Sequence, residues 1–219
     1  MSQPGEEPSP YSQRMPCSLH HLVWFRRDLR LGDNPAWAAA TQQADEVTAL
    51  FVLDPALFDR AGPFRQQALV AHLEGLDAQL RERGGRLRVE HGDPTRVVPA
   101  LTNELDADEV HWNADTTPYA VPRDANVTAA LGDKVQEHWG TVIHEPGRVL
   151  TGKGTLSKVF TPFYNVWNKT EMTPWATGEG DAIIAADSGA GLPRLAAAQE
   201  NVGGEDAARN RLHHFLGRI

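Results

Sequence analysis

The chain has 219 residues, which is enough for one sizeable α/β domain and a short appendage. With 41% hydrophobic and 23% charged residues it can bury a core, and it has no apolar run of about 18 residues that would predict a membrane span. The net charge of −8 argues against this chain being the main DNA-gripping surface, because phosphate binding needs concentrated Lys and Arg.

The first residues, 1–18, are rich in Pro, Ser, Gln and Glu and have no apolar core segment. This composition predicts a disordered tail and not a signal peptide. The single cysteine, Cys17, lies in this tail. It excludes an internal disulfide and favours a reducing, cytoplasmic compartment.

A strand buried on both faces is predicted at 22–25, where four apolar residues follow one another. The charged loop 26–33 comes next. Asn34 then suits an N-cap and Pro35 a first helical residue, because the missing N–H of proline has no partner there. This order of strand, charged loop and helix start is typical of an α/β domain that places a site at the carboxyl end of a strand.

Strand and helix patterns alternate as far as residue 146. The alternation predicts a Rossmann-like α/β fold, with a five-stranded parallel sheet, right-handed crossovers and helices on both faces. Pro99 should kink one helix or split it into two shorter pieces. The predicted strands are 22–25, 46–54, 87–90, 109–113 and 141–144, with 134–139 ambiguous, and the predicted helices are 35–43, 64–83, 94–105 and 122–131.

Beyond residue 146 the alternation weakens. A short aromatic helix is predicted at 160–167, and 173–204 reads as a linker because it is rich in Gly, Ala, Asp and Pro. The last segment, 205–219, predicts an amphipathic helix. Its apolar stripe consists of Ala208, Leu212, Phe215 and Ile219.

Two common site types are disfavoured. Residues 147–154 have the spacing of a P-loop, but Gly154 stands where a magnesium-binding hydroxyl is needed, so a Gly-rich connector is favoured. The adjacent pairs His20-His21 and His213-His214 point apart on a strand or helix. His138 and His144 have no Cys or carboxylate at ligand spacing, so no metal site is predicted.

The first loop has two interpretations on residue types alone. Its arginines, Arg26, Arg27 and Arg30, either form surface ion pairs with Asp28 and Asp33 or line a ligand crevice and a domain junction. Each exposed pair would contribute under about 1 kcal/mol.

The stretch 24–34 reads WFRRDLRLGDN and closely resembles the amino-terminal signature of the DNA photolyase and cryptochrome family. Three further stretches, 50–54, 112–124 and 158–167, agree with the family in the same order. Residues 203–216 resemble the entry to the family's second domain. The resemblance therefore runs from about residue 21 to residue 219.

This resemblance implies that 19–172 is the family's antenna-type α/β domain, which binds a light-harvesting chromophore. In the family a larger helical domain holds FAD and the pocket for pyrimidine dimers. We therefore expect 205–219 to be the first helix of a truncated FAD-binding domain, with FAD and UV-damaged DNA bound by the missing part. The chain alone should be inactive, and its uncovered terminal stripe would favour self-association.

The resemblance also bears on the antenna chromophore. Folate-binding members carry Asn-Glu where this chain has Tyr119-Ala120, so methenyltetrahydrofolate is disfavoured. Arg65 and Asp115 match antenna positions of members that bind the deazaflavin 8-HDF, although Thr117 replaces their glutamate; FMN would fit the same crevice. The alternative is that Arg65 and Asp115 bind nothing, because polar residues are common at the starts of helices and the ends of strands. The residues expected in this antenna crevice are Arg26, Phe51, Val52, Arg65, Asp115, Thr117 and Tyr119.

Three functions stay open at this point. The first is the antenna domain of a deoxyribodipyrimidine photolyase, which repairs UV-induced dimers by blue-light-driven electron transfer from FAD. The second is a cryptochrome-type signalling module without repair. The third is a stand-alone nucleotide-binding α/β protein, which would bind ATP or NAD and no flavin-like chromophore.

Overall fold

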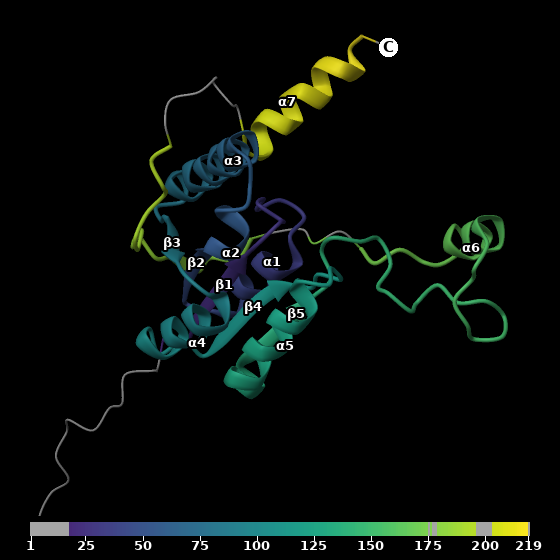
Figure 1. Cartoon of the computed structure of the whole chain (residues 1–219), viewed down its shortest axis with the longest axis horizontal. Coiled ribbons are helices and arrows are strands. Elements are labelled where there is room, and N and C mark those ends of the chain that lie inside the picture. Colours follow the sequence, from purple (N-terminus) through teal and green to yellow (C-terminus); the bar gives the residue numbers. More distant parts are fainter. Residues whose placement is uncertain (1–17, 175, 177–178, 196–202, 219) are drawn as a thin grey trace, which may run out of the picture.

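A parallel sheet in the order β3-β2-β1-β4-β5 forms the centre of the chain (Figure 1). A short strand, β6, pairs with the start of β2, in the place left open because β3 joins β2 only from Ala49 onward. The predicted α/β class is confirmed, with six strands in place of five. The strands are β1 His20–Phe25, β2 Glu46–Leu53, β3 Leu87–His91, β4 Glu109–Asn113, β5 Val135–His138 and β6 Ile183–Ile184.

The structure, a computed structural model, describes residues 18–174, 176, 179–195 and 203–218. The predicted tail up to Cys17, part of the predicted linker and Ile219 lie outside the described residues. Among the described residues, no helix is long and apolar enough to cross a membrane.

Helices cover both faces of the sheet. On one face α1 and α3 pack against Val23 and Phe25, and on the other α4 and α5 pack against Leu22 and Trp24. This alternation along β1 gives a strand buried on both faces, as predicted. The helices are α1 Pro35–Gln43, α2 Pro55–Phe58, α3 Pro63–Glu82, α4 Pro94–Glu104, α5 Ala120–Leu131, α6 Phe160–Trp167 and α7 Glu205–Leu216, with a 3-10 turn at Gly132–Lys134.

The same local signal starts three of these helices. Asn34, Asp54 and Asp93 each accept a hydrogen bond from a backbone N–H of the first turn, and each is followed by proline. Each helix therefore begins directly after a strand or a short loop. This signal predicted α1 and α4 correctly, but α2 was missed because Asp54-Pro55 was interpreted only as the end of a strand.

Two sequence predictions need correction. α4 runs through Pro99 as one element, so the alternative of two shorter helices is wrong. Proline removes only the bond to the carbonyl four residues earlier, and Thr95 lies in the first turn and is only half-buried. The fifth strand is Val135–His138 and not 141–144.

Where the chain leaves the sheet after His138, Gly140 passes close to two other segments. A Cβ on Gly140 would lie 2.6 Å from Asn113 Oδ1 and 2.8 Å from Pro35 Cδ. Arg30 Nη2 also donates to the Gly140 carbonyl at 2.7 Å. The carbonyl is thereby turned toward the first loop, and the strand does not continue through Thr141.

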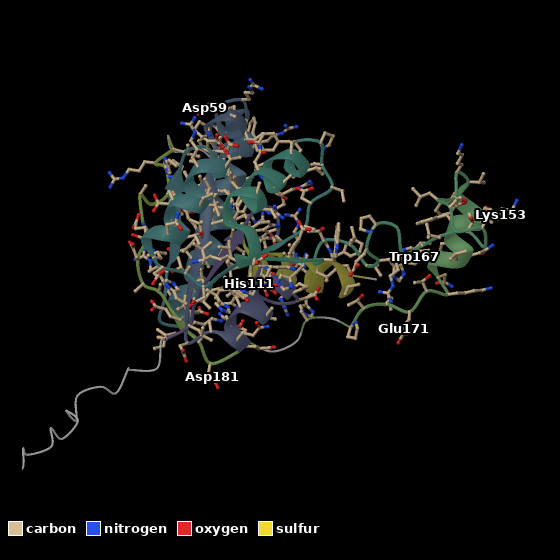
Figure 2. The ribbon with its side chains drawn as sticks, turned by 90° about the horizontal axis from the view of Figure 1, so that it is seen from below. Asp59, His111, Lys153, Trp167, Glu171 and Asp181 are labelled. Atoms are coloured by element: carbon tan, nitrogen blue, oxygen red, sulfur yellow. The ribbon has the colours of Figure 1, made fainter. Side chains whose placement is uncertain are left out.

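α6 lies apart from the sheet, on an irregular segment that we call the α6 arm, residues 148–172 (Figure 1). Figure 2 places Lys153 and Trp167 in this arm, whereas His111 lies in the body. The predicted helix 160–167 is confirmed. The stretch 147–154 contains turns and does not lead from a strand into a helix, unlike a P-loop.

α7 begins against the body and then projects from it (Figure 1). Glu205 Oε2 accepts the backbone N–H groups of Leu31 and Gly32 at 3.2 and 3.1 Å, and Gly204 donates to His72 Nδ1 at 3.0 Å. The first loop therefore holds the start of the terminal helix. Within the predicted linker, β6 is attached to the sheet; the domain boundaries stay a prediction.

Candidate functional site

A cavity of about 410 Å³ opens at the carboxyl ends of β1 and β2, between the starts of α3 and α5. This is the edge of a parallel sheet where α/β proteins bind ligands. All seven residues expected in the antenna crevice line it: Arg26, Phe51, Val52, Arg65, Asp115, Thr117 and Tyr119. The structure thus brings the predicted set together, while its role in binding stays a prediction.

The floor of the cavity is apolar. Phe51 and Val52 are 7% and 6% exposed at the end of β2, and Trp24 is buried beside them on β1. Leu57 and Phe58 of α2 add apolar side chains on the outer side. Such a wall fits a flat aromatic ring and excludes water from it.

Arg26 was expected in the crevice as a loop arginine, and in the structure it is a buried, paired side chain of the cavity wall. Its side chain is 6% exposed and is paired with Asp124, and it also donates to the carbonyl of Asn113. The guanidinium lies 5.2 Å from the ring centre of Trp24. Because its donors already have protein partners, Arg26 shapes the cavity more than it offers free donors to a ligand.

The loop's other charges are divided between buried and exposed positions. Asp28 is buried, and its carboxylate accepts the N–H of Arg26 and the side-chain amide of Asn113. Arg27 lies 3.7 Å from Asp115, and Arg30 lies 3.8 Å from Asp33. The interpretation as surface ion pairs therefore fails for Arg26 and Asp28, which build the strand edge.

Asp115 and Thr117 form one hydrogen-bonded turn at the rim. The backbone N–H of Thr117 donates to Asp115 Oδ1 at 2.9 Å. Burial alone would raise the pKa of Asp115, but this bond and the charge of Arg27 outweigh it and lower the pKa below its ordinary value. The rim therefore carries a fixed negative charge at neutral pH.

Tyr119 closes the cavity by donating its hydroxyl to Asp54, the N-cap of α2. Arg123 lies over the Tyr119 ring at 5.6 Å and over the Trp24 ring at 4.8 Å. Burial, followed by the hydrogen bond to Asp54, raises the pKa of Tyr119 to about 12. The phenol is therefore neutral at physiological pH.

This pKa predicts an alkaline loss of stability. The folded-state value lies above the unfolded value of about 10, so folding favours the protonated phenol, and that contribution is lost as pH rises from about 10 through 12. In urea unfolding, Tyr119→Phe should lose less stability than the native chain between pH 10 and 11.5. Parallel losses in the two proteins would show that the phenol is not held neutral.

Arg65 stands at the outer rim, in the first turn of α3. It is exposed, and its guanidinium has no hydrogen bond or ion pair within the part of the chain that the structure describes. An arginine with free donors beside an apolar cavity suits an anionic or strongly polar group on a ligand. Among the seven predicted residues, Arg65 is thus the clearest candidate for a direct polar contact.

Sequence reasoning missed Asp54 and the two α2 side chains. The signal was present, because Asp54-Pro55 repeats the N-cap and proline pattern of Asn34-Pro35. It also missed Arg123 as a wall residue, although the stretch around it resembled the family. Arg123 lines the wall because it lies over the ring of Trp24, which is 99 positions earlier in the sequence. No local pattern shows such a contact.

A doubly wound parallel sheet with an apolar, charge-rimmed cavity at its carboxyl edge is the arrangement in which α/β proteins bind ligands. The family model described as DNA photolyase matches residues 21–179. The chain therefore belongs to the DNA photolyase family.

The chain is 39% identical over 164 residues to the deoxyribodipyrimidine photo-lyase of Synechococcus sp., covering 71% of this chain and 34% of that protein. A bacterial class III photolyase from Agrobacterium tumefaciens matches with a TM-score of 0.77 at 26% identity, covering 95% of this chain and 46% of that one. An archaeal photolyase from Sulfolobus tokodaii, solved with two FAD molecules and described as implying a novel light-harvesting cofactor, matches with a TM-score of 0.63 at 28% identity, covering 76% and 38%. The chain thus spans about a third to a half of the length of these relatives.

Proposed function

We propose that this chain is the light-harvesting module of a deoxyribodipyrimidine photolyase. The observation that carries the proposal is the cavity of about 410 Å³ at the carboxyl ends of β1 and β2, with its apolar floor and charged rim. A bound chromophore would absorb near-UV or blue light and pass the excitation to FAD. The protein's part is to hold the chromophore in a fixed place and orientation, which a preformed cavity supports.

The proposed occupant is a flavin-class ring, 8-HDF or FMN, in preference to methenyltetrahydrofolate. Phe51 and Val52 supply an apolar surface for a fused ring, and the free donors of Arg65 suit a phosphate or an ionised ring edge. Tyr119 occupies the rim where folate-binding members have an Asn-Glu pair, and its hydroxyl is already used by Asp54. The light-harvesting cofactor suggested for the Sulfolobus relative supports a flavin-class occupant in this family.

Electron transfer from FAD and contact with UV-damaged DNA are proposed for a helical domain of the natural protein. The net charge of −8 fits this division, because a DNA-gripping surface needs concentrated positive charge. The exposed α7 side chains Leu212, Phe215 and Leu216 support such a neighbour. If these side chains lack their partner, the isolated chain should self-associate.

The experiment uses the natural gene product, reconstituted with FAD and then loaded or not loaded with 8-HDF or FMN. Repair of dimer-containing DNA is measured as a function of wavelength. The proposal expects loading to increase repair per incident photon across the chromophore's absorption band and nowhere else. Repair that is unchanged by loading would contradict the antenna role, and no repair under blue light would favour the cryptochrome-type alternative.

A further inference from the structure

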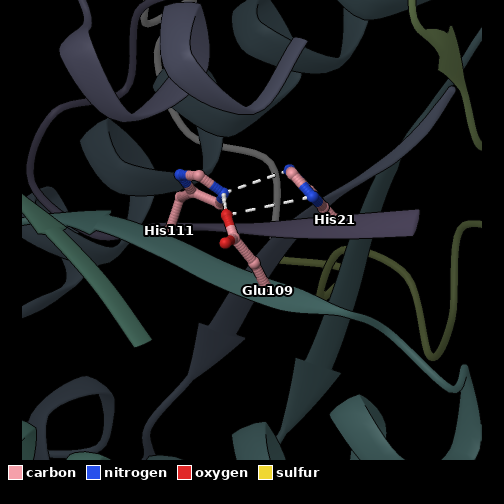
Figure 3. A group of neighbouring side chains, drawn as sticks. All are labelled: His21, Glu109 and His111. Atoms are coloured by element: carbon pink, nitrogen blue, oxygen red, sulfur yellow. Dashed lines mark hydrogen bonds and ion pairs between the residues drawn. The ribbon is translucent and has the colours of Figure 1, made fainter. Parts of the chain in front are cut away.

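A second group of polar side chains lies at the opposite end of the sheet from the cavity. His21 is near the start of β1, and Glu109 and His111 lie on the adjacent strand β4, with their side chains on the same face (Figure 3). His21 and His111 are 3% and 1% exposed. Sequence reasoning predicted no metal site, because it compared histidines only along the chain, whereas the β1–β4 pairing brings these three together.

The distances within this group match those between ligands of one metal ion. His111 Nε2 lies 3.2 Å from His21 Nδ1 and 3.1 Å from Glu109 Oε2. Two ligands of a tetrahedral zinc ion, each bonded at about 2.0–2.1 Å, lie roughly 3.3 Å apart. The three ligand atoms all fall within 4.8 Å of one another, so a small ion can reach them with modest side-chain movement.

One of the three proposed ligand atoms is a buried carboxylate oxygen that lacks a hydrogen bond to any residue the structure describes. Glu109 Oε2 is buried and has no hydrogen-bond partner among the described residues, although it lies close to His111 Nε2. The other oxygen, Oε1, accepts from Gln136 Nε2 at 3.2 Å, which fixes the carboxylate. A buried carboxylate oxygen without a partner is costly, and a cation would satisfy it.

The surroundings of His111 also suit a ligand. Its second nitrogen, Nδ1, lies 3.1 Å from His138 Nε2 on β5. This contact holds the His111 ring in place and leaves Nε2 directed toward His21 and Glu109.

We propose that His21, Glu109 and His111 bind one divalent first-row transition metal ion, such as Zn²⁺, between β1 and β4. Two imidazoles and one carboxylate are borderline ligands of the kind that zinc prefers. These three side chains leave one position of a tetrahedral ion to a further ligand such as water. The ion would join the two central strands far from the chromophore cavity, so its role is structural and independent of light harvesting.

The test measures zinc bound to the full chain, expressed without a tag and stripped with a chelator. We expect one equivalent of Zn²⁺, and a rise in Tm of roughly 5–10 °C when free zinc is about 100-fold above its Kd. X-ray absorption should show nitrogen and oxygen ligands only. The absence of sulfur would separate this site from metal binding at Cys17.

Glu109→Gln keeps the shape and the partly exposed position of the side chain, so it should fold. Because it removes a direct ligand, it should weaken zinc binding by more than the roughly 10–100-fold that is lost when only a hydrogen-bond partner of a ligand is replaced. The control is the double variant His213→Ala/His214→Ala, which removes the exposed histidine pair on α7 and should leave the binding unchanged. No bound zinc in the native chain, a sulfur ligand, loss of binding in the control, or full binding in Glu109→Gln would each overturn the proposal.

Discussion

Replacing Asp124 with asparagine should destabilise the chain by about 3–5 kcal/mol, which is the usual effect of breaking a buried ion pair by removing one partner. Asp124 pairs with Arg26, and the two side chains are 8% and 6% exposed. Asparagine has a similar size, so the change removes a charge and leaves no large cavity. Arg26 then stays buried between Trp24 and Trp112 without its paired carboxylate, and Arg123, which lies 2.7 Å from Asp124, loses the same partner.

The matched control is Glu179→Gln, which breaks the pair with Arg83. Both side chains of that pair are 34% exposed, and its closest N–O distance is 2.7 Å. Water screens such a pair, so we expect a loss under about 1 kcal/mol. The free energy of unfolding is measured by urea titration of both variants, and equal losses would show that the Arg26–Asp124 pair is not a buried anchor of the cavity wall.

Replacing Arg65 with alanine should weaken binding of FMN or 8-HDF by roughly 10–100-fold, because a hydrogen bond to a charged group is worth about 1.5–3 kcal/mol. Arg65 lines the cavity and has no protein partner among the described residues, so its donors are available to a ligand. The side chain is exposed, and its removal should leave the fold and its stability unchanged.

Arg60→Ala is the matched control. Arg60 is an exposed arginine five positions earlier and is not among the residues that line the cavity. The Arg60→Ala variant removes one positive charge from the same region as Arg65→Ala. Comparing the two variants therefore separates a direct contact with the ligand from a general electrostatic effect. The Kd values are measured by fluorescence titration, and equal changes in the two variants would contradict a specific contact at Arg65.

The elements that local signals define were predictable from the sequence. The apolar run 22–25 and the Asn34-Pro35 start gave β1 and α1 correctly, because strand burial and helix capping depend on neighbouring residues. The seven crevice residues were predicted by resemblance and do meet at one cavity. Their meeting follows from strand order, since β1 and β2 are adjacent and end at the same edge of the sheet.

The errors lie where distant contacts decide. The chain after His138 leaves the sheet and Gly140 passes close to Asn113 and Pro35, and neither contact is visible in the pattern 141–144. Residue types alone left Arg26 open between a surface pair and a crevice position, because its buried partner Asp124 is 98 positions away. The histidine group was missed for the same reason, because His21 and His111 meet only through the pairing of β1 with β4.

We propose that the cavity at the ends of β1 and β2 binds a flavin-class antenna chromophore. The most direct test is a fluorescence titration of the native chain with FMN, 8-HDF and methenyltetrahydrofolate, with Arg65→Ala and Arg60→Ala in parallel. The account predicts one equivalent of FMN or 8-HDF bound more tightly than the folate, and weaker binding in Arg65→Ala alone. Tighter binding of the folate, or no binding of any of the three, would contradict it.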